Sequence, residues 1–272
     1  MSYGLLKGKK GIISGALDEN SIAWKVALKA KEEGAIFTLT NAPIAMRMGA
    51  INQLAEQCDA KVIPADATST EDLEKLYTES MDALGGKVDF VLHSIGMSPN
   101  VRKGREYNNL NYEWYMKSVD VSAMSLHKML QSAEKLDAIN EWGSVVSLSY
   151  IAAQRAFPFY NDMADAKAML ESIARSYGYR YAKSKKVRVN TISQSPTPTT
   201  AGTGIGGFDS FFNFAEKMSP LGNATADDCA NYVITLFSDL TRMVTMQNLF
   251  HDGGYSTTGI SEELMAMIQG KE

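Results

Sequence analysis

The chain contains little cysteine and no long apolar segment. Only two of its 272 residues are cysteines, Cys58 and Cys229. So few cysteines argue against a disulfide framework and fit a reducing compartment, so we expect both thiols to be ordinary packed residues. The longest apolar runs are far shorter than the ~20 residues that a membrane span requires, and Met1–Lys10 has no apolar core of a signal peptide. We therefore expect a cytoplasmic protein with no membrane contact.

A basic surface stripe and a cluster of metal ligands are also missing. The formal net charge is −4, with 27 basic and 31 acidic residues, so we expect no nucleic-acid partner. The three histidines do not have the spacing of metal ligands, so we expect no metal site. The most basic short stretch holds Arg102, Lys103 and Arg105. Two interpretations remain open for it: a solvated loop, or a contact site for an anionic substrate or carrier.

Short apolar segments alternate with helical patterns along the chain. The predicted strands are Gly11–Ser14, Ala35–Thr40, Lys61–Ala65, Val88–His93, Ser144–Ser149, Val187–Ser193 and Gln247–His251. The predicted helices are Ser21–Glu33, Met46–Gln57, Thr70–Leu84, Trp114–Leu136, Tyr160–Ala182 and Ala226–Phe237. This alternation predicts an α/β fold with a doubly wound parallel sheet of Rossmann type and helices on both faces, in a single domain over residues 1–272. Residues 194–224 show no obvious regular element, and a connection of that length predicts a lid over the site.

The ends of the predicted strands favour a dinucleotide site. Gly15 follows the first strand, where a glycine lets backbone N–H groups approach a pyrophosphate, although the full GxGxxG pattern is absent. Ser21 is a good N-cap for the helix that follows. Asp66 ends the third strand and could accept a hydrogen bond from an adenine amino group. The segment that follows the second strand, Asn41–Pro43, contains Ala42 and no acid, and Arg47 lies just beyond, so the choice between NADH and NADPH stays open.

Tyr160 and Lys167 form the candidate catalytic pair. Their spacing places both side chains on one face of a helix. A lysine ammonium beside a phenol favours phenolate, so we expect Lys167 to lower the pKa of Tyr160 and make it a proton donor near neutral pH. The spacing alone is weak evidence for a catalytic pair, but the position of the pair after the strand Ser144–Ser149 strengthens that evidence.

With these residues in place, the chain resembles the short-chain dehydrogenase/reductase superfamily, and within it the bacterial enoyl-[acyl-carrier-protein] reductases. The resemblance extends over nearly the whole chain and rests on Gly15, Ser21–Ala23, Asp66, His93–Gly96, Ser149–Tyr150, Arg155–Ala156, Pro158, Tyr160–Asn161, Met163, Lys167, Val187–Asn190, Ile192–Ser193 and His251–Gly254.

The resemblance implies reduction of a trans-2-enoyl thioester on acyl carrier protein, in the fatty-acid elongation cycle. The implied cofactor is NADH, with NADPH as the alternative. The resemblance also implies a homotetramer packed through Trp114–Leu136 and Tyr160–Ala182. Hydride would go to the β-carbon, Tyr160 would stabilise the enolate oxygen, and Lys167 would hold the nicotinamide ribose. The implied catalytic residues are Tyr150, Tyr160 and Lys167. The implied cofactor contacts are Gly15, Ser21, Ile22, Ala42, Asp66, Ala67, Ser94, Ile95, Gly96, Lys167, Thr197 and Thr199. The implied substrate contacts are Ser98, Tyr150 and Tyr160.

Two alternatives compete with this interpretation. Counting thirteen residues back from Tyr160 gives Ser147, the position of the usual superfamily serine, which would make the chain a ketoreductase. We favour Tyr150 because Ser147 falls inside a predicted strand, whereas Tyr150 follows the strand and resembles the Tyr-x9-Tyr-x6-Lys pattern of the enoyl reductases. The second alternative is a non-catalytic module that senses a dinucleotide, against which Tyr160 and Lys167 argue.

The lid departs from the family pattern in ways that affect the expected contacts. Thr199 keeps the family threonine, but Pro198 stands in place of an arginine, and Asp209 lies where basic residues usually meet the acidic carrier protein. The lid also holds four aromatic residues, which either line the acyl channel or pack in the core or against another subunit: Phe208, Phe211, Phe212 and Phe214. In the helix Trp114–Leu136, Asp120 replaces the asparagine that supports a proton relay in many superfamily members.

Overall fold

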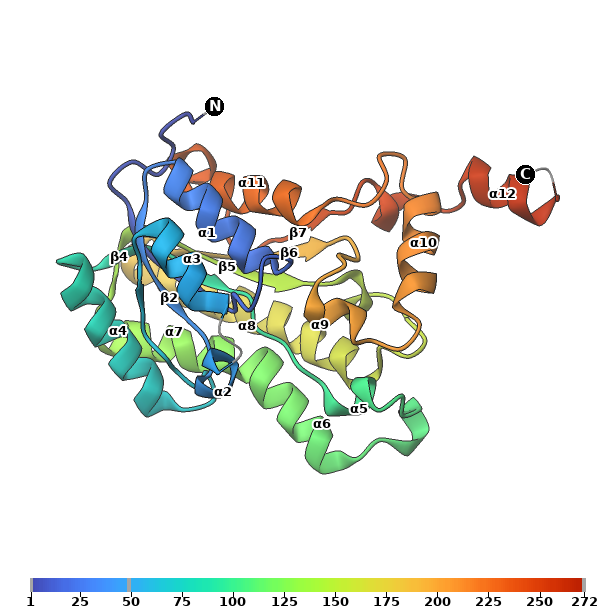
Figure 1. Ribbon diagram of the computed structural model, residues 1–272, viewed down its shortest axis with the longest axis horizontal. Helices are drawn as coiled ribbons and strands as arrows, with labels where there is room; N and C mark the ends of the chain where they lie inside the picture. Colours follow the sequence, from blue (N-terminus) through green and yellow to red (C-terminus); the bar gives the residue numbers. More distant parts are fainter. Residues whose placement is uncertain (1, 48–49, 271–272) are drawn as a thin grey trace.

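Seven parallel strands form one sheet at the centre of the molecule (Figure 1). The computed structural model describes residues 2–47 and 50–270. The strand order is β3-β2-β1-β4-β5-β6-β7. The strands are β1 (Lys10–Ser14), β2 (Ile36–Thr40), β3 (Lys61–Val62), β4 (Val88–His93), β5 (Ile139–Ser149), β6 (Arg188–Gln194) and β7 (Asn248–His251). The predicted doubly wound sheet of Rossmann type is confirmed, and its order reverses between β1 and β4.

Helices cover both faces of this sheet, each over its own apolar core. One face carries α1 (Ile22–Glu32), α3 (Ala50–Cys58) and α11 (Ala226–Phe237) (Figure 1). The other face carries α4 (Thr70–Leu84), α7 (Ser125–Lys135) and α8 (Asn161–Lys185). The remaining helices are α2 (Pro43–Met46), α5 (Pro99–Arg102), α6 (Tyr112–Val119), α9 (Thr200–Thr203), α10 (Phe208–Met218) and α12 (Glu262–Ile268). Within the described ranges, none of the helices is both long and apolar enough to cross a membrane.

Most predicted elements appear with small shifts at their ends, but three differ more, and one of these is β5, which begins at Ile139 and not at Ser144. The predicted helix Met46–Gln57 is wrong at its start, because Met46 ends the separate helix α2, which Pro43 opens at its first turn. The described part of the predicted helix begins at Ala50, and residues 48–49 lie outside the described residues. The predicted strand Lys61–Ala65 is too long, since pairing with β2 as a strand ends at Val62.

The predicted helix Trp114–Leu136 contains a π-helical segment, Asp120–Met124, between α6 and α7. Serines on either side donate to carbonyls four residues earlier: Ser118 to Trp114 at 2.8 Å and Ser125 to Val121 at 2.6 Å. Such back-bonding competes with the helical ladder, and π segments often occur at functional sites. This segment contributes to the wall of the cavity described below.

The segment 194–224 is more regular than predicted. It contains α9 and the eleven-residue helix α10, which buries Phe208, Ala215 and Met218. The aromatic residues of α10 provide the apolar face that a helix needs, and this periodicity was hidden among the glycines and prolines that surround it. Helix α12, which was not predicted, extends away from the body of the molecule (Figure 1).

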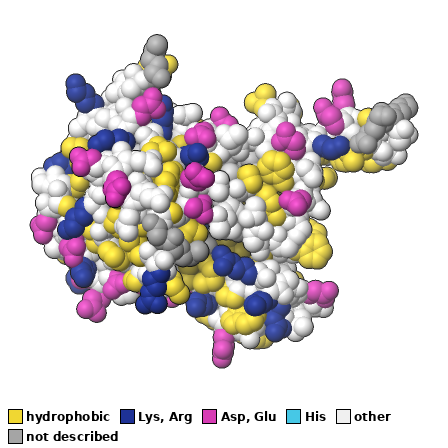
Figure 2. Space-filling model, in the orientation of Figure 1, with side chains coloured by type: hydrophobic (Ala, Val, Ile, Leu, Met, Phe, Trp, Pro, Cys, Tyr) yellow, Lys and Arg dark blue, Asp and Glu magenta, His cyan; other side chains and the backbone are white. Residues whose placement is uncertain are grey.

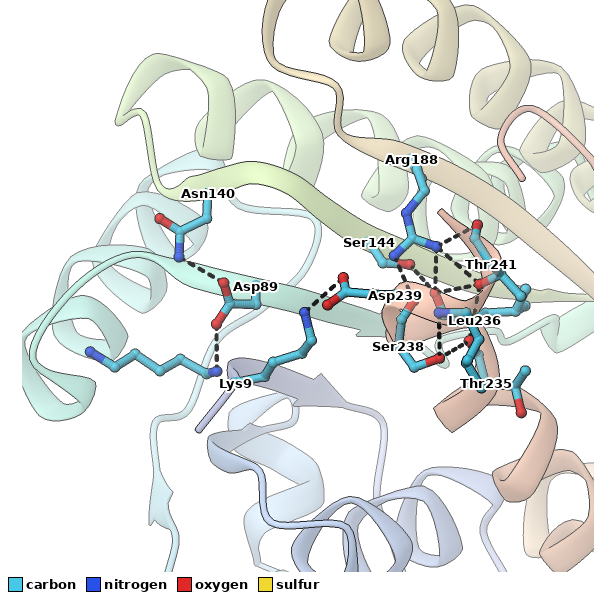
Figure 3. Close-up of polar contacts among 12 residues, drawn as sticks. Lys9, Asp89, Asn140, Ser144, Arg188, Thr235, Leu236, Ser238, Asp239 and Thr241 are labelled. Carbon is cyan, nitrogen blue, oxygen red and sulfur yellow. Dashed lines mark hydrogen bonds and ion pairs between the residues drawn. The ribbon is translucent and has the colours of Figure 1, made fainter. Parts of the chain in front are cut away.

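Arg188, at the start of β6, joins α11 to the sheet at the edge where the strands begin (Figure 3). Its side chain is buried and donates to the carbonyls of Leu236 at 2.9 Å, Thr241 at 3.0 Å and Ser238 at 3.2 Å. A cation suits this place, because the last carbonyls of a helix carry partial negative charge. Arg188 therefore stabilises the scaffold rather than the site.

Candidate active site

A cavity of about 1200 Å³ lies at the carboxyl ends of the strands. It is large for a single drug-sized ligand and could hold a dinucleotide with part of a second ligand. It includes the crevice between β1 and β4, where the strand order reverses. Every residue that the sequence assigns to a site lines it: Gly15, Ser21, Ile22, Ala42, Asp66, Ala67, Ser94, Ile95, Gly96, Ser98, Tyr150, Tyr160, Lys167, Thr197 and Thr199.

The loop after β1 passes very close to the end of β4. Gly15 has a φ of +91°, and a Cβ atom on it would lie 1.9 Å from the carbonyl oxygen of Ser94. Only glycine fits this crossing. Ser21 stands at the N-cap position of α1, as predicted, although its hydroxyl makes no cap bond. The hydroxyl instead accepts from the N–H groups of Leu17 and Asp18, both at 3.0 Å, which leaves the first N–H groups of α1 open to a phosphate.

The region expected to hold the adenosine is lined by the ends of β2 and β3. Asn41 donates to the carbonyl of Ala16 at 3.0 Å and accepts from the N–H of Ala42 at 2.8 Å, so its side chain shapes the turn. One carboxylate oxygen of Asp66 accepts from the N–H and hydroxyl of Thr68, so Asp66 organises the turn before α4 while lining the cavity. Arg47 is not among the residues that line the cavity in the described ranges. The adenosine end therefore lacks an evident cation for a 2′-phosphate.

Tyr150, Tyr160 and Lys167 meet at the other part of the cavity. The rings of Tyr150 and Tyr160 have centroids 5.0 Å apart. Lys167 is buried on α8, and its Nζ donates to the carbonyl of Leu148 at 2.7 Å. The three side chains come from the end of β5 and the first two turns of α8, as the sequence predicts.

Burial controls the pKa values of these groups. It lowers the pKa of Lys167 to about 8 and raises the pKa of both Tyr160 and Tyr150. The prediction that Lys167 lowers the pKa of Tyr160 is therefore wrong, since desolvation alone determines the shift of that phenol. Tyr160 stays neutral and can donate a hydrogen bond to an oxygen that becomes negative.

Glu171 is a site residue that sequence reasoning missed. Its carboxylate is buried one helical turn after Lys167 and raises the pKa of that lysine against the larger effect of burial. It accepts from the hydroxyl of Ser149 at 2.7 Å and from the side-chain amide of Gln154 at 3.0 Å. Glu171 therefore joins α8 to the segment that carries Tyr150. Its spacing of four residues from Lys167 on one helix face was the available signal.

Ser147 is not part of the cavity. It is fully buried in β5, and its hydroxyl lies 2.8 Å from Nδ1 of His93, whose Nε2 lies 2.8 Å from the hydroxyl of Ser125. Burial lowers the pKa of His93 to about 3, so the imidazole is neutral and serves as a packed link between strand and helix. The ketoreductase alternative thus loses the serine on which it depends.

Asp162 fixes the wall of the cavity next to Tyr160. This carboxylate is fully buried and accepts from the hydroxyls of Ser98 and Ser118, both at 2.7 Å, and from the amide of Asn100 at 3.0 Å. Ser98 lines the cavity, but its hydroxyl is engaged with Asp162, so its predicted contact with substrate stays a prediction. On the same wall, Asp120 lines the cavity and pairs with Lys128 at 2.6 Å.

Residues of the predicted lid make local contacts, and some of them line the cavity. Thr199 caps α9 by accepting from the N–H of Gly202 at 2.9 Å, and the hydroxyl of Thr197 donates to the carbonyl of Ser195 at 2.9 Å. The next residue, Thr200, donates to Asp18 in the loop after β1. Phe208 and Phe211 line the cavity, whereas Phe212 packs on Phe208 and the exposed Phe214 lies against Tyr255. The acyl-channel face and the core or subunit contact both stay predictions.

Comparison with known proteins identifies close relatives. The sequence profile of a family described as enoyl-(acyl carrier protein) reductase matches residues 15–256. The enoyl-[acyl-carrier-protein] reductase [NADH] FabI of Rickettsia bellii is 35% identical over 264 residues, covering 95% of this chain and 98% of that protein. The crystal structure of a FabI–NADH complex from Alistipes finegoldii is 65% identical, with a TM-score of 0.96, and covers 97% of this chain and 93% of that one. The corresponding reductase (NADH) of Aquifex aeolicus is 31% identical, with a TM-score of 0.86, and covers 94% of this chain and 99% of that one.

Proposed function

The chain belongs to the enoyl-(acyl carrier protein) reductase family, and from this premise we propose that it reduces trans-2-enoyl-[acyl-carrier-protein] to the saturated acyl thioester with NADH. The reaction belongs to the fatty-acid elongation cycle. The observation that carries the proposal is that Tyr150, Tyr160 and Lys167 line the same cavity as Gly15, at which the loop after β1 passes the end of β4. Non-catalytic sensing of a dinucleotide, which the sequence left open, explains neither the tyrosine pair nor the relatives.

The residues fit a bound nicotinamide dinucleotide. Gly15 and the open N-terminus of α1 suit the pyrophosphate, and Asp66 with Ala67 suits the adenine. Lys167 is a buried ammonium with one protein hydrogen bond, so it has donors left for the ribose hydroxyls. When bound, NADH supplies the hydride that reduces the substrate. Arg47 is not among the described residues that line the cavity, so it offers no cation for a 2′-phosphate at the adenosine end, which agrees with the NADH named for the relatives.

Tyr160 stabilises the negative charge that develops on the thioester oxygen. Its phenol is neutral because burial raises its pKa, and a neutral phenol donates a hydrogen bond that strengthens as the oxygen gains charge. A preorganised donor of this kind contributes about 3 kcal/mol to the transition state. Tyr150 lies against Tyr160 and Phe157, where it forms the wall for the acyl chain. Glu171 joins α8 to Ser149 and Gln154, which lie on either side of Tyr150 in the sequence, and its charge acts on Lys167.

We further propose that residues 194–224 close over the bound ligands and that four copies assemble through the helices Trp114–Leu136 and Tyr160–Ala182. The contact between Thr200 and Asp18 supports closure, because it joins the lid to the cofactor loop. Exposed apolar side chains on these helices, among them Met116, Met169 and Tyr179, support assembly. We also propose that the enzyme acts in the cytoplasm, since both of its cysteines are free thiols.

The test is nicotinamide absorbance decay with a trans-2-enoyl thioester, measured with NADH and NADPH separately. We expect faster turnover with NADH and a fall in kcat of about 100-fold in Tyr160→Phe, since one oxyanion donor is lost. Tyr3→Phe is the matched control, because that phenol is exposed near the N-terminus, and it should leave kcat unchanged. Wild-type kcat in Tyr160→Phe would refute the role given to this phenol.

A further inference from the structure

Four cations flank one side of the cavity and make no ion pair within the part of the chain that the structure describes. They lie at the end of α5, in the turn after it, and on α6: Arg102, Lys103, Arg105 and Lys117. Arg105 donates to the carbonyl of Asn109 at 3.1 Å and lies over the ring of Trp114. The other three are exposed and have no side-chain partner in the described ranges. Figure 2 shows Lys and Arg side chains gathered over α5 and α6.

This positive charge is local. Residues 97–119 hold these four cations and two carboxylates, Glu106 and Glu113, neither of which pairs with them. The opposite wall, residues 194–224, holds one cation and two carboxylates, and the whole chain has a net charge of −4. An acidic macromolecule that approaches the cavity is therefore attracted to the α5–α6 side and not to the lid.

The cations are carried by a rigid support. Ser98, Asn100 and Ser118 bind the buried carboxylate of Asp162, which links α5 and α6 to the first turn of α8. Asn100 also exchanges two hydrogen bonds of 3.0 Å with the backbone of Asn111 at the start of α6. A surface held in this way loses little conformational entropy when a partner binds.

The support also lies directly beside the reacting groups. Val101, in α5, packs with Tyr160 and Met163 in one apolar cluster. The next residue, Arg102, and Lys117 on α6 both line the cavity. A macromolecule bound to these cations would thus deliver a flexible thioester arm into the space around Tyr160.

We propose that the acyl carrier protein docks on the α5–α6 side of the cavity, through its acidic surface and the cations Arg102, Lys103, Arg105 and Lys117. This inference rests on the proposed function, which supplies the carrier as the partner. Asp209, on the lid helix α10, repels the same acidic surface. The basic stretch that the sequence left open between a solvated loop and a contact site is thereby assigned to the carrier.

The experiment measures binding separately from turnover. Fluorescently labelled acyl carrier protein is titrated with wild type, with the triple variant Arg102→Gln, Lys103→Gln, Lys117→Gln, and with a control triple variant. The control changes three exposed cations at the opposite edge of the sheet and loses the same total charge: Lys7→Gln, Lys183→Gln, Lys186→Gln. Arg105 is left unchanged because it packs on Trp114.

We expect the first variant to weaken carrier binding by about tenfold or more and to flatten its dependence on salt, while the control stays within about twofold of wild type. Turnover of a trans-2-enoyl N-acetylcysteamine thioester, which has no carrier, reports any separate effect of Arg102 and Lys117 on the cavity that they line, and it should change less than carrier binding. Equal binding by all three proteins, or no binding by wild type, would overturn the docking surface. A change of oligomeric state confined to the first variant would also overturn it, because the cations would then face a second copy. Failure of wild type to reduce the small thioester would refute the proposed function instead, since binding is read independently.

Discussion

Lys167 and Glu171 lie one helical turn apart on α8, and both are buried beside the cavity. Burial favours the neutral amine of Lys167, and the carboxylate of Glu171 favours the ammonium. Because the resulting pKa is about 8, the charge of this lysine changes within the range in which enzymes are assayed. Its bond to the cofactor ribose is strongest while the ammonium persists.

NADH affinity should therefore fall as the pH rises through about 8. In Glu171→Gln the midpoint should move to lower pH, because the group that raises the pKa of Lys167 is removed. The dissociation constant of NADH, read from its fluorescence between about pH 6 and pH 10, checks this. Lys167→Met should bind weakly at every pH with no midpoint, and Glu263→Gln, on the distant helix α12, should match wild type. An unchanged midpoint in Glu171→Gln would exclude the electrostatic role of Glu171.

Gly15→Ala should lower the affinity for NADH without unfolding the protein. The added Cβ would lie 1.9 Å from the carbonyl of Ser94 at a φ of +91°, so the loop after β1 must move away from β4. We expect NADH affinity to fall by at least tenfold, while the cooperative thermal transition remains. Gly8→Ala is a suitable control, because its φ is also positive but no atom lies within 4 Å of the added Cβ. Similar NADH affinities in both variants would contradict the role of the crossing.

For single residues, the sequence located the side chains that line the cavity but did not predict the pKa shift of Tyr160. Position in the strand correctly predicted that Ser147 would be buried, since it faces His93 inside the sheet, whereas Tyr150 lines the cavity. The phenol pKa was wrong because a sequence shows neighbours along a helix but not the loss of water around them. Glu171 was missed because its partners, Ser149 and Gln154, come from a different segment of the chain.

Among the elements, the link between β6 and α11 depends on Arg188. Arg188→Met should lower the free energy of unfolding by about 2–4 kcal/mol, because the substitution removes the buried hydrogen bonds that the guanidinium donates to the carbonyls of Leu236, Thr241 and Ser238. Chemical denaturation measures this loss, and NADH affinity should change little, since Arg188 lies at the far edge of the sheet (Figure 3). Arg180→Met, which removes an exposed ion pair with Glu134, should cost less than about 1 kcal/mol. Equal losses in the two variants would contradict this account.

The sequence predicted the boundaries of helices and strands well where the hydrophobic periodicity was strong. It predicted them poorly where tertiary contacts determine the ends of an element. The bounds of α11 were predicted to the residue, because Thr225 and Asp228 form a capping box and the apolar pattern is regular. β5 begins at Ile139 and not at Ser144, since pairing with β4 recruits residues that have no strand pattern of their own. The π-helical segment Asp120–Met124 was not predicted; besides the local serine back-bonds, Ser122 within it accepts from the N–H of Met97, a contact that only the folded chain provides.

For the whole molecule, the alternation of strands and helices was enough to predict a parallel sheet with two helical layers, since few topologies satisfy such a chain. The carboxyl edge of that sheet then placed the site before any contact was known. The surface proposed to meet the carrier could not be placed in the same way. It depends on contacts that bring α5, α6 and the lid to Asp162 and Tyr160, and these segments lie far from those two residues in the sequence.

The central claim is that hydride reaches the β-carbon of an enoyl thioester. The most direct measurement supplies NADH carrying deuterium at C4 of the nicotinamide, in each stereochemical form, with equal amounts of a trans-2-enoyl and a 3-ketoacyl thioester, and identifies the products by mass spectrometry and NMR. We expect one of the two labelled forms to yield a saturated acyl thioester with a single deuterium at C3, and the 3-ketoacyl thioester to be recovered unchanged. Deuterium in a 3-hydroxyacyl product, with the enoyl thioester recovered unchanged, would contradict the account.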